Sequence, residues 1–559
     1  MFYNCTSLDY LNISIFEMYN ATDMSFMFSG CKNLTYVDLF NKLNQNIINM
    51  KSMFYDCNML ESINLTNYET IHLEDSEKMF YNCYSLENLS LSQFDTNLVT
   101  NMGNMFANCY SLKYLDLSNF NSSNVVNFDS MFFNCTSITS LNIDNFDSSQ
   151  ITNMDTMFYG CSSLISLNLD HFNTDLITNM SHLFAFCKNL TVLKIDNFKT
   201  LGVKTMNSMF FNCSQLTHIN LTYFDTSNVT DMDYMFCNCT KLTNLKINHF
   251  NTSSVTSMVS MFDGCNDLED LNITLFDTSN VNNMTNMFRD CMSLIELNIS
   301  KFITSQVTNM SHMFTNCKKL NNLDLSSFDF AMVEDMDNMF SDCSVLTSIK
   351  IESFNGNMVK TIYSMFSGCT LLESLDLSAF NTPNVINCSY LFYKCFSLNS
   401  LKMPNITFDR VINMEYMFYD CWSLESLDLS SLRTNSVINI DKMFYGCSSL
   451  KELNLTSFNT SKITTMNSLF YGCTELTSIS VHNFDTSNVL DMENMFYNCR
   501  SLRSLDLSSF KTNNSANMKG MFTNCLSLTT LDLSHFDTNK VTNMYSMFQN
   551  SSNLISLNL

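Results

Sequence analysis

Cysteine is the residue type whose number and spacing in this chain most clearly suggest chemistry. Of the 23 cysteines, 21 recur every 26 residues from Cys5 to Cys525, and only Cys237 and Cys388 lie outside this series. Regularly spaced thiols can form disulfides, bind metal ions or pack as small apolar groups. Because the sequence contains no CxxC pair, a zinc site is the least favoured of these alternatives.

The histidines do not form a set that could act together. Three of them share one position of the 26-residue period, namely His171, His249 and His535. Because they lie several repeats apart, they cannot converge on one metal ion or substrate. The sequence also lacks a nucleophile elbow, a phosphate-binding loop, a dinucleotide fingerprint and an HExxH motif. We therefore predict a non-enzymatic protein without a cofactor, and no catalytic, cofactor-binding or metal-binding residues.

Aspartates at one position of the period raise the possibility of calcium binding. They are Asp95, Asp147, Asp225, Asp277, Asp329, Asp485 and Asp537. Calcium requires six to eight oxygen ligands, yet this position is occupied by Asn121, Asn173 and Lys199 in other repeats. An aspartate that accepts hydrogen bonds from its own turn is the simpler interpretation, and the sequence leaves both alternatives open.

The elements that position these residues follow from the period itself. A Met-Phe pair begins each repeat except at Leu183, Leu391 and Leu469, and the second residue is always Phe, from Phe2 to Phe548. A fixed period of 20–50 residues indicates a solenoid, in which each repeat buries its apolar face against its neighbours. We predict about 21 repeats in a single continuous domain over residues 1–559. Because neither end resembles a polar cap, we expect this domain to be a fragment of a longer array.

Two stretches of each repeat predict its secondary structure. The L-x-x-L-x-L stretch, as in Leu112–Leu117, ends in the two-residue alternation of a strand with one buried face. The stretch Met102–Phe106 has the i, i+3, i+4 apolar spacing of a short helix, which Thr100 or Asn101 would cap. The predicted fold is an α/β leucine-rich-repeat solenoid, with parallel strands on one face and short helices on the other.

The regular positions of Cys and Phe predict a structural ladder inside the solenoid. Its first members are Cys5, Cys31, Cys57, Cys83, Cys109 and Cys135, with Phe2, Phe28, Phe54 and Phe80 as an aromatic spine. Successive cysteines should lie about 4.8 Å apart, close enough for disulfides, but their nearly parallel side chains would strain such bonds. A reduced ladder is favoured, and partial disulfide formation stays open.

Tyrosine follows the Met-Phe pair in five consecutive repeats. These residues are Tyr393, Tyr419, Tyr445, Tyr471 and Tyr497. If their rings are exposed, they form an aromatic stripe suited to a protein or glycan partner. The alternative is that they pack beside the predicted helices.

Charge and hydropathy exclude several partners. The formal net charge of -24 repels nucleic acid and anionic membranes. No apolar run reaches the roughly 18 residues of a membrane-spanning helix, so we expect no direct membrane insertion within this segment. The first 16 residues lack a basic region followed by an apolar one, so we expect no signal peptide in this chain.

Asn-x-Ser/Thr sequons are frequent, for example at Asn12 and Asn272. A chain rich in Asn, Ser and Thr produces them by chance, so they do not establish secretion. Several fall on the outward strand face, where glycans would cover the surface available to a partner. We therefore expect few to be occupied, or binding to occur elsewhere.

The phrase S-L-x-x-L-D-L-S-x-F-D-T-S-N-V-T-N-M-x-x-M-F-x-N-C recurs with small changes, for example in residues 111–135 and 501–525. It resembles the 26-residue repeat of bacterial surface proteins, a branch of the BspA-like leucine-rich repeat families, and the resemblance covers essentially the whole chain. It implies a protein that is secreted or on the cell surface and adheres to host proteins, other cells or matrix through an unidentified protein or glycan ligand.

Two alternatives to adhesion remain. The absence of a signal peptide in this chain and a reduced cysteine ladder favour a cytoplasmic interaction scaffold. The absence of polar caps favours a structural protein that forms filaments by stacking end to end.

Overall fold

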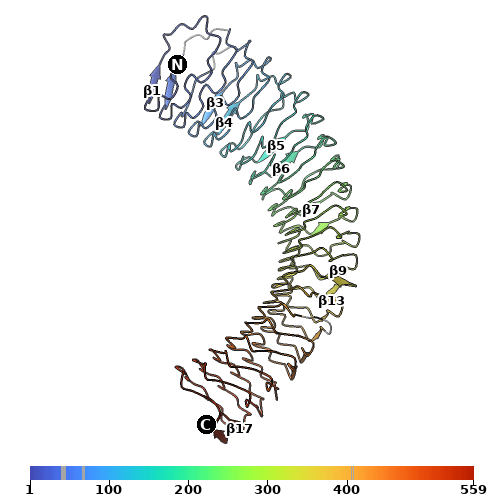
Figure 1. Cartoon of the computed structure of the whole chain (residues 1–559). Coiled ribbons are helices and arrows are strands. Elements are labelled where there is room, and N and C mark those ends of the chain that lie inside the picture. Colours follow the sequence, from blue (N-terminus) through green and yellow to red (C-terminus); the bar gives the residue numbers. More distant parts are fainter. Residues whose placement is uncertain (40–45, 66–69, 404–405, 407) are drawn as a thin grey trace. The chain divides into compact units, whose positions relative to one another are not determined.

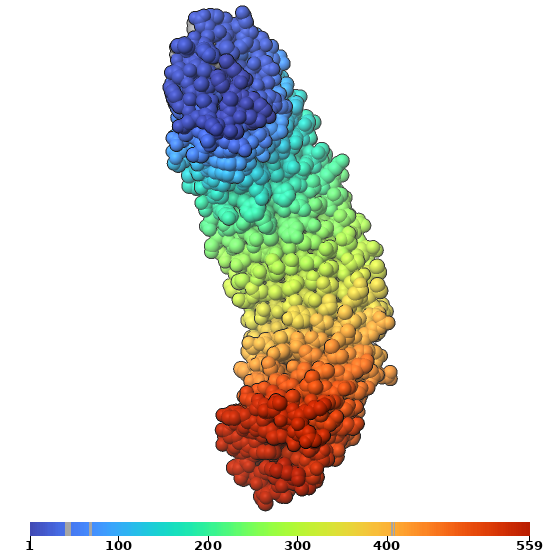
Figure 2. Space-filling model, turned by 60° about the vertical axis from the view of Figure 1, so that its left-hand side comes forward, coloured from blue at the N-terminus to red at the C-terminus, as the bar shows by residue number. Residues whose placement is uncertain are grey.

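The computed structural model describes residues 1–39, 46–65, 70–403, 406 and 408–559 (Figure 1). It consists of two compact units, Met1–Asp277 and Thr278–Leu559. Each unit is a stack of coils, one coil for each 26-residue repeat. In Figure 2 the colours follow one another as successive bands, because coils adjacent in sequence are also adjacent on the surface. The architecture is a leucine-rich-repeat-like solenoid of about 21 coils.

The strands of the first unit are short and pair in parallel between neighbouring coils. They are β1 (Tyr10–Asn12), β2 (Tyr36–Asp38), β3 (Asn88–Ser90), β4 (Tyr114–Asp116), β5 (Ser166–Asn168), β6 (Val192–Lys194), β7 (Asn244–Leu245) and β8 (Asp270–Leu271). The pairs are β1–β2, β3–β4, β5–β6 and β7–β8. Each residue pairs with the residue 26 positions later, as Leu89 does with Leu115, so the register follows the sequence period.

The second unit repeats this arrangement. Its strands are β9 (Asn322–Asp324), β10 (Ser348–Lys350), β11 (Phe354–Asn355), β12 (Ser374–Asp376), β13 (Phe380–Asn381), β14 (Ser400–Lys402), β15 (Ser426–Asp428), β16 (Glu452–Asn454), β17 (Thr530–Asp532) and β18 (Ser556–Asn558). The parallel pairs are β9–β10, β11–β13, β12–β14, β15–β16 and β17–β18. The predicted long sheet is therefore divided into short pieces, most of them two-stranded, although single-residue bridges through Ser62 connect β2 to β3.

The predicted short helices are wrong: the described part of the chain contains no helix. In Met102–Cys109, Asn104 and Asn108 adopt left-handed conformations with φ of 58° and 62°, which a right-handed helix excludes. The backbone N–H groups alternate between two kinds of partner. Met105 N–H donates to Met102 O (3.3 Å) within the coil, whereas Phe106 N–H donates to Met131 O (3.0 Å) in the next coil.

We call this segment, residues 102–109 and its equivalents in other coils, the turn edge. Among the described residues, every one with positive φ lies in one of its two left-handed positions, represented by Asn104 and Asn108. Asn and Asp adopt this conformation more readily than other L-residues, and Gly160 (φ 72°) occupies the second position in another coil. The apolar spacing that predicted a helix therefore arises from two linked tight turns.

The core contains the predicted apolar residues. In the coil that begins at Met209, the side chains of Met209, Phe210 and Cys213 are completely buried, and Phe224 and Met232 are at most 3% exposed. The Phe spine stacks between coils: ring centroids are 5.6 Å apart for Phe2–Phe28, 5.2 Å for Phe28–Phe54 and 5.5 Å for Phe54–Phe80. Rings at this separation add attraction beyond the area they bury.

A column of buried hydroxyl groups, which we did not predict, accompanies the apolar core. Thr226 is 1% exposed, and its Oγ1 donates to Asn251 O in the next coil (2.9 Å). Thr96 and Thr174 make the equivalent bonds to Asn121 O and Lys199 O, both 2.8 Å. Each of these three hydroxyls satisfies a backbone carbonyl of the next coil, whereas Thr382 Oγ1, at the same repeat position, is buried without a hydrogen-bond partner among the described residues.

Candidate binding surfaces

The cysteine ladder lies inside the turn edge. Its thiols donate to the carbonyl oxygen of the Phe residue one coil earlier: Cys31 Sγ to Phe2 O at 3.0 Å, and Cys57 Sγ to Phe28 O at 3.2 Å. Ser551 replaces cysteine in the last repeat, and its hydroxyl makes the same bond to Phe522 O at 2.7 Å. The thiol therefore acts as a small buried donor that links coils.

The thiols are poorly suited to nucleophilic chemistry. All 23 cysteines are free, and all except Cys5 are buried. Burial raises the pKa of Cys83 and Cys135 well above the ordinary value, and that of Cys109 to about 12. Only the thiolate is reactive, so at neutral pH these groups remain protonated and inert.

The two cysteines outside the ladder are also buried. Cys237 lies 3.9 Å from Asp263 Oδ2, and Cys388 lies 3.7 Å from Asn413 O. The described residues contain no group of three or more His, Cys, Asp or Glu side chains that could hold a metal ion.

The three histidines that share a repeat position form hydrogen bonds with backbone carbonyl groups. The Nε2–H groups of His171, His249 and His535 donate to the carbonyl oxygens of Ile143, Leu221 and Leu507, at 2.9, 3.1 and 2.8 Å. Each carbonyl belongs to the preceding coil, so the three histidines contribute links between coils.

The aspartate column considered for calcium accepts bonds from its own turn. Asp225 Oδ1 accepts the Ser227 N–H (3.0 Å) and hydroxyl (2.6 Å). The hydroxyl and backbone hydrogen bonds from Ser227 lower the pKa of Asp225. Asp95 and Asp147 accept the equivalent backbone N–H groups at 2.9 and 2.8 Å.

The five tyrosines of the predicted stripe form a stacked, half-buried column in the second unit. Ring centroids are 5.0 Å apart for Tyr393–Tyr419, 4.5 Å for Tyr419–Tyr445, 4.3 Å for Tyr445–Tyr471 and 4.6 Å for Tyr471–Tyr497. Desolvation raises the pKa of Tyr471 to about 12. Because the rings cover one another's faces, the column offers a partner mainly ring edges and hydroxyl groups.

The strand edge, residues 114–118 and their equivalents, is less regular than the turn edge and is hollowed where strand pairing stops. β4 pairs with β3, and the next bridge in this column joins Ser140 to Ser166. A hollow of about 420 Å³ lies at this interruption, lined by Tyr114, Asp116 and Asn142 among others. A second hollow, of about 390 Å³, lies at the step between β14 and β15, beside Lys402 and Asp428.

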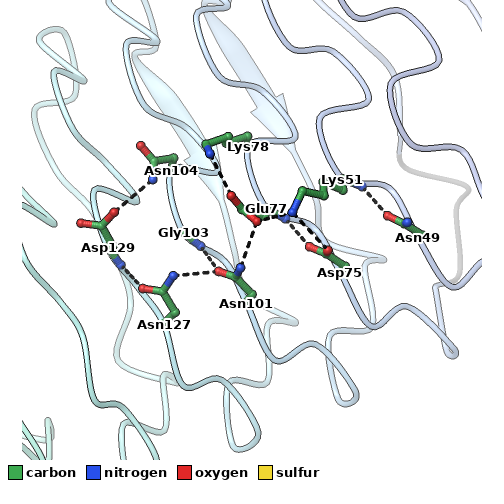
Figure 3. Close-up of polar contacts among 10 residues, drawn as sticks. All are labelled: Asn49, Lys51, Asp75, Glu77, Lys78, Asn101, Gly103, Asn104, Asn127 and Asp129. Atoms are coloured by element: carbon green, nitrogen blue, oxygen red, sulfur yellow. Dashed lines mark hydrogen bonds and ion pairs between the residues drawn. The ribbon is translucent and has the colours of Figure 1, made fainter.

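Polar side chains link coils along the surface of the turn edge (Figure 3). Glu77 binds Lys78 Nζ at 2.9 Å and accepts Asn101 Nδ2 at 3.2 Å, and it also pairs with Lys51. Burial raises the pKa of Glu77, but the bonds from Lys51 and Lys78 outweigh it, so the net shift is downward. Asn127 Nδ2 extends the chain of contacts to Asn101 Oδ1 at 3.0 Å.

The sequence matches the protein family described as "Mycoplasma protein of unknown function, DUF285". Seven overlapping segments match: residues 1–112, 85–166, 164–271, 258–374, 322–426, 360–478 and 441–557. Together they cover nearly the whole chain. This chain belongs to the DUF285 family.

Solved structures similar to this DUF285 chain include a leucine-rich repeat protein from Bacteroides ovatus, with 19% identity, a TM-score of 0.38, and coverage of 76% of this chain and 84% of that chain. A leucine-rich cell surface protein from Faecalibacterium prausnitzii has 17% identity and a TM-score of 0.32, with coverages of 68% and 81%. An internalin from Listeria monocytogenes has 15% identity and a TM-score of 0.21, with coverages of 72% and 88%.

No curated protein matches the sequence. Across the described ranges, no helix is long and apolar enough to cross a membrane.

The sequons at the strand edge of this DUF285 chain have a structural explanation. Asn272 Oδ1 accepts both the backbone N–H and the hydroxyl of Thr274, at 3.2 and 2.8 Å. Asp324 makes the same two bonds with Ser326, at 2.9 and 2.5 Å. The motif is therefore an Asx turn that follows the strand, in which Asn and Asp are interchangeable.

Two sets of exposed apolar side chains on the DUF285 solenoid were not predicted. Ile386, Ile412 and Ile438 lie in successive coils and are 44–47% exposed, and Trp422, 48% exposed, stacks on Phe396 at 4.2 Å. Elsewhere the isoleucine position is often Thr, as at Thr230. The only tryptophan of the chain and this run of isoleucines were the sequence signals available.

Proposed function

We propose that this chain is a non-enzymatic surface protein of the BspA-like type, which mediates adhesion by binding a protein or glycan through its extended repeat surface. Cell-surface or secreted localisation is part of this proposal. So is the continuity of residues 1–559 as one repeat domain.

One observation carries the proposal: the ladder thiols from Cys31 to Cys525 are buried, and each coil presents outward side chains at the same repeat positions. The thiols donate to carbonyls in the core, while strand-edge side chains such as Ser166 and Asn168 in β5 are exposed. A surface that repeats in this way suits many weak contacts that add together. It does not supply the converging groups that catalysis requires.

Deletion of whole coils tests this mode of binding. Removing 26, 52 or 78 residues in register preserves the columns and shortens the surface, so binding to immobilised matrix proteins, host cells or glycans should weaken in steps. Single substitutions at exposed columns should have small effects. A single exposed substitution that abolishes all binding would contradict a distributed surface.

An intracellular scaffold is the second candidate, because a ladder of free thiols suits a reducing compartment. Protease shaving of intact source cells, followed by mass spectrometry of the released peptides, separates the two. Peptides from this chain in the shaved fraction support surface exposure. Their recovery only after lysis supports the scaffold.

A further inference from the structure

The hollow beside Tyr114 is lined by an aromatic ring, unlike the strand-edge hollows beside Lys402 and beside Asp506. Tyr114 is 57% exposed, and the residue at its position in the next coil is Ser140, whose small side chain leaves the ring face open. The hollow of about 420 Å³ also contains Asp116, Asn142 and Asp144.

The charges around this hollow leave it acidic. Lys113, the one basic residue that lines it, is paired with Glu87 at 3.1 Å. Asp116 accepts the Ser118 N–H through Oδ1 at 3.0 Å, and its second oxygen has no partner among the described residues. Asp116 and Asp144 therefore place two carboxylates beside one exposed aromatic ring.

Part of this combination recurs three coils earlier in the first unit, where the sequence has Thr66 in place of Asp144. Tyr36 and Asp38 correspond to Tyr114 and Asp116, and the next coil again supplies a serine, Ser62. The other face of Tyr36 stacks on Tyr10 at 6.1 Å, and Tyr10 OH donates to Asp38 Oδ2 at 2.6 Å. The second copy thus has one covered ring face, one face toward a small residue, and a fixed carboxylate.

We propose that these two places bind two basic side chains, Lys or Arg, of an extended polypeptide that lies along the coils of the first unit. This inference rests on the proposed function and names the chemistry of its partner. An aromatic face and a carboxylate together favour a cation. The net charge of -24 attracts a basic segment over a distance.

The spacing of the two places restricts the partner further. Three coil steps at the usual strand separation amount to about 14 Å. In an extended chain, residues i and i+4 point to the same side and lie about 13 Å apart. The two basic residues should therefore be four positions apart.

A labelled peptide tests this geometry on the whole chain. The probe is a nine-residue Ser/Thr peptide with two arginines four positions apart, and binding is followed by fluorescence anisotropy at low salt. A peptide of the same composition with its arginines three positions apart should bind about tenfold more weakly, because the second arginine then points away.

Variants drawn from residues the repeat already uses keep the fold intact. Tyr114→Ser, and separately Asp116→Asn with Asp144→Asn, should each weaken binding of the first peptide about tenfold. Asp506→Asn with Asp532→Asn removes the same charge from a hollow with no aromatic ring among its lining residues, and should change binding less than about twofold.

Equal losses of peptide affinity in the two double Asp→Asn variants would overturn the inference, because they would indicate an effect of net charge alone. Equal affinities for the two peptide spacings would also overturn it. So would Tyr114-dependent binding of a neutral oligosaccharide together with no binding of the peptide. Failure of the proposed function is distinguishable, because coil deletion would then leave adhesion unchanged even if the peptide binds. If the peptide does not bind while coil deletion weakens adhesion, only this inference fails.

Discussion

The turn edge and the strand edge of each coil have different regularity. At the turn edge the bond from Phe N–H to the carbonyl of the next coil recurs in both units, for example from Phe210 to Met235 O (3.0 Å) and from Phe470 to Met495 O (2.9 Å). At the strand edge, pairing extends over two or three residues and is interrupted, as between β14 and β15. The backbone of the turn edge thus holds the coils together, which frees strand-edge side chains to vary.

The largest contrast between the edges should be in thiol access. Iodoacetamide at pH 8 should modify a Ser166→Cys thiol on β5 at least about 1000-fold faster than the buried ladder, which reacts only through opening of the coils. Mass spectrometry of native and urea-unfolded protein measures this. Cys5, which is exposed, is the internal positive control, and rapid modification of Cys213 would contradict a closed turn edge.

Truncation of a stacked ring should have the largest effect on stability. Phe210 is completely buried, with ring centroids at 5.8 Å from Phe184 and 5.5 Å from Phe236. Phe210→Ala should lower the free energy of unfolding by about 3–5 kcal/mol, because it leaves a cavity. Urea denaturation measures the change. Tyr223→Ala in the same coil, at a residue 68% exposed, should lower the free energy of unfolding by less than about 0.5 kcal/mol. Equal losses in the two variants would show that the stacked core ring contributes no more to stability than an exposed one.

Two threonines that lie four residues apart make similar hydrogen bonds between coils and differ in burial, so they test the effect of burial alone. Thr226 and Thr230 both donate to a carbonyl of another coil, at 2.9 and 3.2 Å, but only Thr226 is buried. Thr226→Val should cost about 1 kcal/mol, since a buried carbonyl loses its donor. Thr230→Val should cost much less, because water replaces the hydroxyl. The same urea titration distinguishes them, and a larger loss at Thr230 would reverse the interpretation.

The smallest effects concern pH. Hydrogen bonds from Ser430 lower the pKa of Asp428 at the strand edge, so its contribution to stability is present above about pH 4 and lost as the pH falls through the folded-state value. Burial raises the pKa of Asp441 at the turn edge, so protonation favours the fold and stability rises as the pH falls toward about 4.

Asparagine variants separate these two contributions. Asp428→Asn should remove part of the acid-induced loss of stability, and Asp441→Asn part of the acid-induced gain, each by less than about 1 kcal/mol. Urea midpoints at pH 7 and pH 4 measure both. The same direction of change in both variants would show that the two carboxylates do not differ as described.

The sequence predicted the period, the parallel register and the buried columns, because apolar residues such as Phe210 recur in register. The prediction of secondary structure failed where one sequence pattern fits two different local structures. The spacing of Met102 and Phe106 fits a helix as well as two linked turns, and residues such as Tyr234 and Lys442 adopt φ of 58° and 54° without any sequence signal. The burial of Thr226 could not be predicted locally, because its acceptor lies 25 residues away.

The coil-to-coil bonds of the turn edge also determine how the chain responds to mechanical load. Because these bonds join each coil only to its neighbours, tension on the chain ends acts on the outermost coil first. Each detached coil releases 26 residues, or about 85 Å of extended chain once the thickness of the coil is subtracted. A pulling trace should show a staircase of such increments, so the protein would lengthen gradually and resist shear without breaking as a whole.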